Sequence, residues 1–261
     1  MLTTDTMLTS RFSFVFAFAF AGLLASCGAE SNGTTSSSSS NSGLYGAGTS
    51  APEASKPKPP PPPVTGPEVL VEIETPFGTM TAKLYNETPL HRANFLKLAE
   101  AGFYDDLLFH RVIRGFMVQG GDPESKGAPT GKALGSGGPG YTVPAEIDPR
   151  FIHKKGALSA ARLGDGANPA KASSGSQFYV VQGSVQTEQS LASSDAQNGY
   201  SGDQREIYYA TGGTPFLDGQ YTVFGEVIEG LDIIDKIAAV KTAAGDRPVE
   251  DVWMKVRVVA D

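Results

Sequence analysis

The chain has 261 residues and a formal net charge of −7 at pH 7. This length allows one large domain or two small ones, and without a basic surplus nothing points to a nucleic-acid partner. Cys27 is the single cysteine, so a disulfide within the chain is excluded.

Residues 1–26 have the pattern of an export signal. Arg11 precedes an apolar run at residues 12–24, which has the length of a signal-peptide core and is shorter than the roughly 20 residues that a membrane-spanning helix needs. Translation from Met7 instead of Met1 would remove the unusual Asp5, and both starts stay open.

The signal ends in Leu24-Ala25-Ser26-Cys27, which is similar to a bacterial lipobox, where cleavage precedes a cysteine that then carries lipid. We therefore predict lipidation of Cys27 and attachment to a bacterial membrane in the cell envelope, with the folded part in the periplasm or outside the cell. The alternative is an ordinary cysteine at the end of a signal. Gly28 favours the outer membrane over the inner one.

Residues 27–66 are rich in Gly, Ser, Thr and Pro and end in KPKPPPPPV. This composition cannot form a core. We expect a flexible serine run followed by a stiff polyproline II rod, which together form a tether. A proline-rich ligand for a partner domain is the alternative.

The folded domain is predicted at residues 67–261 and begins with a hairpin, because apolar residues alternate at 69, 71 and 73 and again at 80, 82 and 84. Thr88 as N-cap and Pro89 at the first helical position predict a helix over residues 89–101 that ends at Gly102. A glycine-rich loop at 126–140, further short strands, a helix near 231–237 and a final strand at 252–258 follow. Many short strands with two helices fit an antiparallel barrel capped at its ends.

Residues 109–123, FHRVIRGFMVQGGDP, predict a strand, a tight turn and a second strand. Alternation places Met117 and Gln119 on one face of the second strand. Arg111 is a permanent cation, so with an amide and an apolar patch it suits binding of a neutral peptide group rather than acid–base chemistry.

This stretch resembles the cyclophilins, a family of peptidyl-prolyl isomerases. SSGSQFYVVQG at residues 173–183 is similar to the family's SGSQFF strand, and LDGQYTVFGEVIEGLDIIDKI at 217–237 is similar to its LDGKHVVFGKV region. The resemblance covers residues 68–259. It implies a mainly β fold, a closed eight-stranded antiparallel β-barrel capped by two α-helices.

The resemblance also implies roles for residues at matching positions. Arg111, Phe116 and Gln119 match catalytic positions, and the proline pocket and groove match Met117, Gly135, Ala161, Gln177, Tyr179, Phe216, Leu217 and Tyr221. For Gln177, a buried structural amide is the alternative reading.

Several positions depart from the family pattern. Tyr179 replaces a phenylalanine, Tyr221 stands where histidine is common, and Phe216 stands where some members have tryptophan. Arg162 replaces an asparagine that contacts the substrate backbone. The loops at 163–173 and 184–213 are longer than in the smallest members.

We predict an isomerase that rotates X-Pro bonds in proline-containing segments of exported proteins, as a monomer. No cofactor or metal is expected, since the three histidines lack metal-ligand spacing. A non-catalytic module that binds proline-containing peptides on the same fold is the second hypothesis.

Overall fold

The computed structural model describes residues 64–259, so the predicted signal, Cys27 and nearly all of the predicted tether lie outside the described residues. Within residues 64–259, no helix combines the length and apolar character needed to cross a membrane.

The strands are β1 (Val69–Thr75), β2 (Gly78–Leu84), β3 (Leu107–Leu108), β4 (Arg111–Ile113), β5 (Met117–Gly120), β6 (Thr142–Val143), β7 (Ala157–Ala160), β8 (Ser173–Ser174), β9 (Phe178–Val181), β10 (Val223–Glu229) and β11 (Trp253–Val258). The helices are α1 (Pro89–Glu100), α2 (Glu188–Asn198), α3 (Gly202–Ala210) and α4 (Leu231–Ala238), with 3-10 turns η1 (Pro123–Ser125), η2 (Pro215–Leu217) and η3 (Ala244–Asp246).

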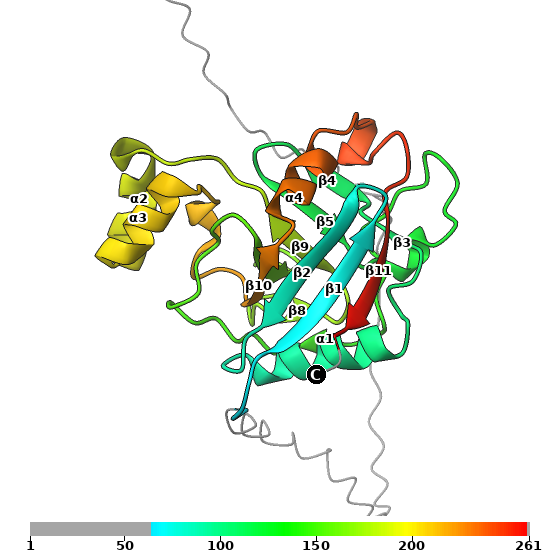
Figure 1. The fold of residues 1–261 in the computed structure, drawn as a ribbon, viewed down its shortest axis with the longest axis horizontal. Coiled ribbons are helices and arrows are strands. Elements are labelled where there is room, and N and C mark those ends of the chain that lie inside the picture. The colour runs from blue at the N-terminus through cyan, green and yellow to red at the C-terminus, as the bar shows by residue number, and fades with distance from the viewer. Residues whose placement is uncertain (1–63, 260–261) are drawn as a thin grey trace, which may run out of the picture. The chain divides into compact units, whose positions relative to one another are not determined.

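Nine of these strands form one antiparallel sheet in the order β3-β11-β1-β2-β10-β7-β9-β5-β4, as Figure 1 shows in part. The predicted first hairpin is confirmed as β1 and β2, in which Ile73 lies opposite Met80. Both side chains are fully buried, because alternation along each strand directs these residues to the core face. The predicted strand, turn and strand at 109–123 are confirmed as β4 and β5.

The sheet curls until its two edges, β3 and β4, are separated along the chain only by Phe109 and His110. The predicted mainly β antiparallel fold is confirmed, but the edges are joined by the chain and not by hydrogen bonds, so the barrel is not closed. The sheet has nine strands where eight were predicted, because β3 and β4 are separate strands: β3 pairs only with β11, and β4 pairs with β5. The Phe109 amide donates to the carbonyl of Val252 at 2.8 Å, which holds this crossing segment against the neighbouring loop.

Helix α1 confirms the predicted helix and runs from Pro89 to Glu100. Thr88 occupies the N-cap position as predicted, but its hydroxyl makes no capping hydrogen bond and donates to the Tyr85 carbonyl at 3.4 Å. The Glu146 carboxylate instead accepts hydrogen bonds from the amides of Leu90 at 3.0 Å and His91 at 2.9 Å. A carboxylate from a distant loop thereby pairs two of the amides that every helix start leaves free.

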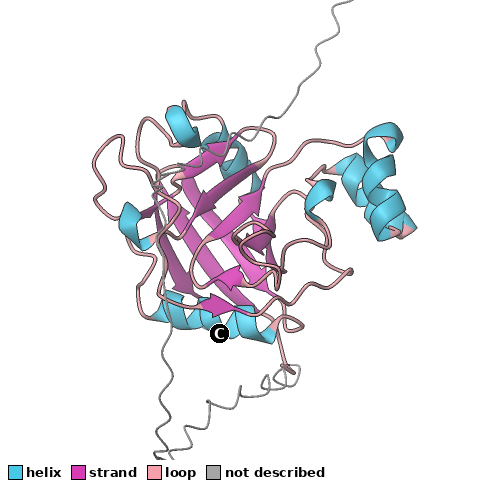
Figure 2. Ribbon diagram, turned by 180° about the vertical axis from the view of Figure 1, so that it is seen from behind, coloured by secondary structure: helices cyan, strands magenta, loops and turns pink. Residues whose placement is uncertain are grey.

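The described residues contain four α-helices where two were predicted, and the additional pair is α2 and α3. Both lie within the 184–213 segment that the sequence indicated only as a long loop. Each begins with a capping box, Thr187 with Ser190 and Ser201 with Gln204. Figures 1 and 2 show this helical pair standing beside the sheet. We call residues 184–213 the helical insertion.

Between residues 64 and 259, the buried apolar side chains form three clusters. The largest fills the space between the sheet and helices α1 and α4. A second cluster is centred on Met117, Tyr179 and Leu217, and a third joins Leu191, Tyr200 and Tyr208 of the helical insertion to Ile152. The second cluster carries the candidate site.

Candidate functional site

The register of three neighbouring strands brings the predicted site residues together. Arg111 on β4 lies opposite Gln119 on β5, and Gln119 lies opposite Tyr179 on β9. Directly opposed residues on adjacent strands share one face of the sheet. The strand register alone therefore places a cation, an amide and an aromatic ring in one row.

A pocket of about 170 Å³ opens beside this row and is lined by Arg111, Phe116, Met117, Gln119, Ala161, Arg162, Tyr179, Leu217 and Tyr221. Eight of the eleven predicted site residues meet in this lining. Met117 is only 1 % exposed, and Tyr179 and Leu217 are also buried. A small cavity with such apolar walls suits a compact ring such as that of proline.

The three remaining predicted residues surround the pocket without lining it. Phe216 is 64 % exposed, and its ring packs against Phe116 with centroids 5.5 Å apart. Gln177 is buried, and its Nε2 donates to the carbonyls of Gly135 at 3.0 Å and Gly137 at 2.7 Å. Gln177 is therefore a buried amide that holds the glycine loop in place.

Hydrogen bonds orient the polar groups at the mouth of the pocket. Arg111 Nη1 donates to Gln119 Oε1 at 3.4 Å, and Gln119 Nε2 donates to Gln177 Oε1 at 3.1 Å. The Gln119 oxygen is thus directed to the arginine. The glycine loop that Gln177 holds is also bound by Asp122, whose carboxylate accepts hydrogen bonds from the amides of Gly135 and Gly137.

Residues 70–258 match the family model described as cyclophilin type peptidyl-prolyl cis-trans isomerase/CLD. The chain belongs to the cyclophilin-type peptidyl-prolyl cis-trans isomerase family. It is therefore an isomerase of the cyclophilin class.

Curated relatives agree with this cyclophilin assignment. A Staphylococcus haemolyticus protein with the name of a peptidyl-prolyl cis-trans isomerase is 38% identical over 195 residues, which cover 74% of this chain and 92% of that protein. A Staphylococcus aureus protein so named is 37% identical over 71% of this chain and 88% of its own length. A Streptococcus pyogenes protein named as a bifunctional phosphatase/peptidyl-prolyl cis-trans isomerase is 38% identical, and this chain spans 39% of its length.

Solved structures support the fold. A Cryptosporidium parvum cyclophilin type isomerase aligns with a TM-score of 0.54 at 24% sequence identity, over 74% of this chain and 99% of that one. A second structure of that protein, determined in the presence of the dipeptide Ala-Pro, has a TM-score of 0.53. At this identity the likeness concerns the fold alone.

One residue that the sequence did not single out contacts the arginine of this cyclophilin. Asp246, at the end of η3, places a carboxylate oxygen 3.5 Å from Arg111 Nε. Its backbone is left-handed, with φ of 61°, a conformation that aspartate adopts more readily than most residues. Arg111 and Asp246 lie far apart in the sequence, so only the folded chain reveals the pair.

Arg162, a departure from the cyclophilin pattern, forms one side of the pocket mouth. Its guanidinium stacks over the Tyr221 ring with 4.5 Å between Cζ and the centroid. Nε donates to the Gln220 carbonyl at 2.8 Å, and Nη1 pairs with Asp165 at 2.6 Å. Arg162 therefore ties the start of the long 163–173 loop to the edge of the pocket.

A second pocket of about 600 Å³ adjoins the first and shares Arg111 and Gln119 with it. Its other walls come from the loops at 130–135 and 243–251. His110 also lines this pocket, and burial lowers the pKa of this histidine. The side chain is consequently held in its neutral form at pH 7.

Ser173, His91 and Glu146 have the contacts of a hydrolase triad. His91 Nε2 is 2.8 Å from the Ser173 hydroxyl, and Nδ1 is 2.6 Å from the Glu146 carboxylate. Ser173 is only 1 % exposed, so a substrate cannot reach its hydroxyl. The trio fastens the start of α1 to β8, which pairs with β6 in a separate two-stranded sheet, and is not a nucleophilic site.

Proposed function

We propose that this cyclophilin accelerates rotation about X-Pro bonds in exported proteins, as a monomer held at a bacterial membrane through lipid on Cys27. The observation that carries the catalytic part is the joint placement of Arg111 and Gln119 at the mouth of a small pocket with the buried walls Met117, Tyr179 and Leu217. The Ala-Pro dipeptide used with the Cryptosporidium parvum relative supports a proline-containing segment as the ligand.

The chemistry needs a donor and a pocket, but no nucleophile. Resonance gives the peptide bond a rotation barrier of about 18–20 kcal/mol, and twisting the bond localises a lone pair on the prolyl nitrogen. The Arg111 guanidinium can donate to the twisting amide, and this interaction is stronger in the transition state than in either planar state. In a dry site one such charge-assisted bond contributes about 2–4 kcal/mol.

Positioning supplies the rest of the acceleration. A rate increase of five decades corresponds to about 7 kcal/mol, so the hydrogen bond accounts for roughly half. The buried walls Met117, Tyr179 and Leu217 can fix the proline ring while Gln119 holds the neighbouring backbone, so that only one side of the bond turns.

The anchor and the exported clients rest on the sequence, because Cys27 lies outside the described residues. A signal core, a lipobox-like segment and a Gly/Ser/Pro-rich stretch precede the folded domain in that order. We expect labelled palmitate to be incorporated into the chain in bacterial cells and lost in Cys27→Ala. Equal labelling of both chains would contradict the anchor.

The catalytic part is tested by comparing the chain from residue 28 onward with its Arg111→Ala variant. Arg114→Ala is the matched control, because Arg114 is an exposed arginine in the same hairpin and does not line the pocket. With an X-Pro tetrapeptide we expect Arg111→Ala to lose at least 30-fold in kcat/KM while it stays folded, and the control to change less than twofold. If the parent is slow yet binds proline peptides, the chain is a binding module on this fold.

A further inference from the structure

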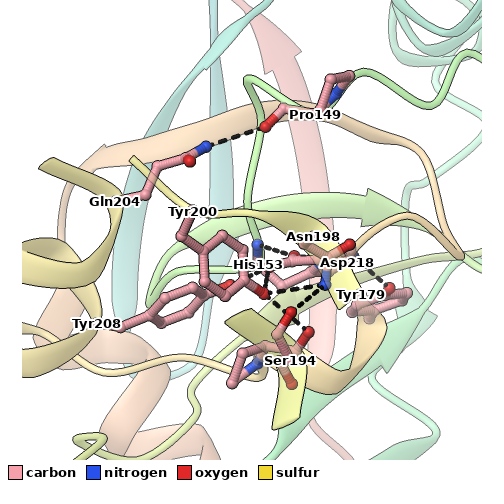
Figure 3. Close-up of polar contacts among 10 residues, drawn as sticks. Pro149, His153, Tyr179, Ser194, Asn198, Tyr200, Gln204, Tyr208 and Asp218 are labelled. Atoms are coloured by element: carbon pink, nitrogen blue, oxygen red, sulfur yellow. Dashed lines mark hydrogen bonds and ion pairs between the residues drawn. The ribbon is translucent and has the colours of Figure 1, made fainter. Parts of the chain in front are cut away.

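A buried chain of polar contacts starts at the wall of the proline pocket and runs away from it. The Tyr179 ring lines the pocket, while its hydroxyl lies 3.0 Å from His153 Nε2 (Figure 3). His153 is 0 % exposed, and its Nδ1 lies 2.7 Å from an oxygen of Asp218. The His153 amide donates to the same oxygen at 2.8 Å.

The other oxygen of Asp218 is bound by the helical insertion. The hydroxyls of Tyr200 and Tyr208 each donate to Oδ2 at 2.5 Å, as Figure 3 shows. Tyr200 lies between α2 and α3, and Tyr208 lies on α3. The carboxylate of Asp218 thus receives hydrogen bonds on both oxygens, and all side chains of this chain of contacts are buried.

Asp218 also lies beside a second part of the pocket wall. It directly follows η2, which provides Phe216 and the pocket residue Leu217. Tyr200 reaches this turn too, since its hydroxyl lies 3.2 Å from the Pro215 carbonyl oxygen. The contacts from the helical insertion therefore meet the pocket through Tyr179 on one side and Leu217 on the other.

A third wall residue rests on this assembly. The Tyr221 ring packs edge-on against Tyr179, with centroids 6.0 Å apart, and against His153 at 6.4 Å. A movement of His153 would displace both tyrosines, because packed aromatic rings in an interior have no free space to absorb it.

Asp218 needs hydrogen-bond donors because its carboxylate is buried, and this need keeps His153, Tyr200 and Tyr208 in place around it. A buried carboxylate is tolerated only where donors surround it, and the loss of one donor leaves an oxygen unpaired unless the neighbouring groups move. Burial and the Asp218 charge both raise the pKa of Tyr200 and of Tyr208, so both hydroxyls keep their protons and remain donors at physiological pH.

We propose that the helical insertion braces the proline pocket through Asp218, and that Tyr200 and Tyr208 are positioning residues that set which ring the pocket accepts. The proposal rests on the proposed function, since the pocket is the one assigned to proline there. Without the two hydroxyls, Asp218 draws His153 and the η2 turn into new positions. The walls at Tyr179 and Leu217 then separate, and the pocket loses its preference for a five-membered ring.

The test compares Tyr200→Phe/Tyr208→Phe with the parent chain on two peptides, one with proline and one with pipecolic acid, its six-membered analogue. Tyr209→Phe is the control, because Tyr209 follows Tyr208 on α3 and its hydroxyl is not one of the two that bind Asp218. We expect the ratio of kcat/KM for pipecolate to kcat/KM for proline to rise at least fivefold in the double variant and less than 1.5-fold in the control. A merely structural role would lower both values together and leave the ratio unchanged, which would overturn the proposal.

A second experiment measures whether the effect of the two tyrosine substitutions reaches the pocket through Tyr179. A Tyr179→Phe background removes the hydrogen bond between His153 and the Tyr179 hydroxyl but leaves the contacts through η2 and Tyr221. The same double substitution should therefore raise the ratio by a smaller factor there than in the parent. An undiminished rise in that background would refute the path through Tyr179. If the double variant does not fold, Tyr200→Phe alone replaces it, with an expected rise of at least twofold.

Peptide binding separates this proposal from the proposed function. The dissociation constants of the proline and pipecolate peptides, measured by calorimetry, give a preference ratio that does not depend on isomerase activity. If the parent is inactive but the double variant still has a different binding ratio from the parent, catalysis is refuted and the brace is retained. If the parent is active but the double variant has the same ratios in kcat/KM and in binding as the parent, the brace alone is refuted.

Discussion

The pairing of Arg111 with Asp246 leads to a prediction about how the arginine is held. We consider Asp246→Asn, which removes the charge but keeps the size of the side chain. Asparagine also tolerates the left-handed backbone that Asp246 adopts, with φ of 61°. The substitution therefore isolates the carboxylate, and we expect the free energy of unfolding to change by no more than about 1 kcal/mol.

The magnitude follows from the exposure of the pair. The two side chains are 41% and 47% exposed, and the atoms Arg111 Nε and Asp246 Oδ2 are 3.5 Å apart. Ion pairs this exposed contribute about 0.2–1 kcal/mol. If that energy holds the guanidinium over the pocket, its loss lowers kcat/KM by about 1.4- to 5-fold.

The assay is isomerisation of an uncharged X-Pro peptide at low and high salt. The Debye length falls from about 30 Å at 0.01 M to about 3 Å at 1 M ionic strength, so salt screens the pair in the parent. We expect the parent to slow at 1 M salt to the rate of Asp246→Asn, whereas the variant changes little with salt.

Asp232→Asn is the matched control, since it removes another exposed carboxylate, paired with Lys236 at 2.8 Å on α4. It should retain the rate and the salt dependence of the parent. Equal rates for the parent and Asp246→Asn at low salt, or an unchanged salt dependence in that variant, would refute the reasoning.

Three further predictions concern stability and pH. Gly121→Ala should lower the free energy of unfolding by about 2–4 kcal/mol in urea titrations, because φ is +86° and the added methyl would lie against the Ser176 carbonyl; a loss below about 1 kcal/mol would contradict this. Burial lowers the pKa of His110 below its ordinary value of 6.5, so the unfolded chain binds the proton first and stability falls as pH drops below about 6.5, by at most about 1.4 kcal/mol per pH unit. His110→Phe should reduce that slope, and an unchanged slope would assign it to other groups. Since Arg111 keeps its charge, kcat/KM should vary less than twofold between about pH 6 and 9, and a bell-shaped profile would indicate a titrating catalytic group.

Local sequence patterns were sufficient for much of the fold. Alternating apolar residues predicted the β1–β2 hairpin, and Pro89 with Gly102 marked the ends of α1 within one residue. These signals work because strand and helix periodicity depend on neighbours within a few positions. Helices α2 and α3 were not predicted, although Ser201 followed by Gln204 matches the sequence pattern of a capping box at the start of α3.

The hydrogen-bond partners of individual side chains could not be predicted in this way. Thr88 has the residue type of an N-cap, yet the carboxylate of Glu146 serves the start of α1. Asp246 reaches Arg111 from a distant turn. Such pairs depend on where remote loops come to rest, and no local pattern contains that information.

The sequence by itself determined the family, the pocket-forming residues of β4 and β5, and the charge state of Arg111, because these follow from residue type and from order along short segments. Only the tertiary structure decided that the edges of the sheet remain unpaired and that the Tyr179 hydroxyl turns away from the pocket to His153. It also joined Asp218 to the helical insertion. A buried carboxylate takes its donors from whichever segments pack around it, and that packing is a property of the whole folded domain.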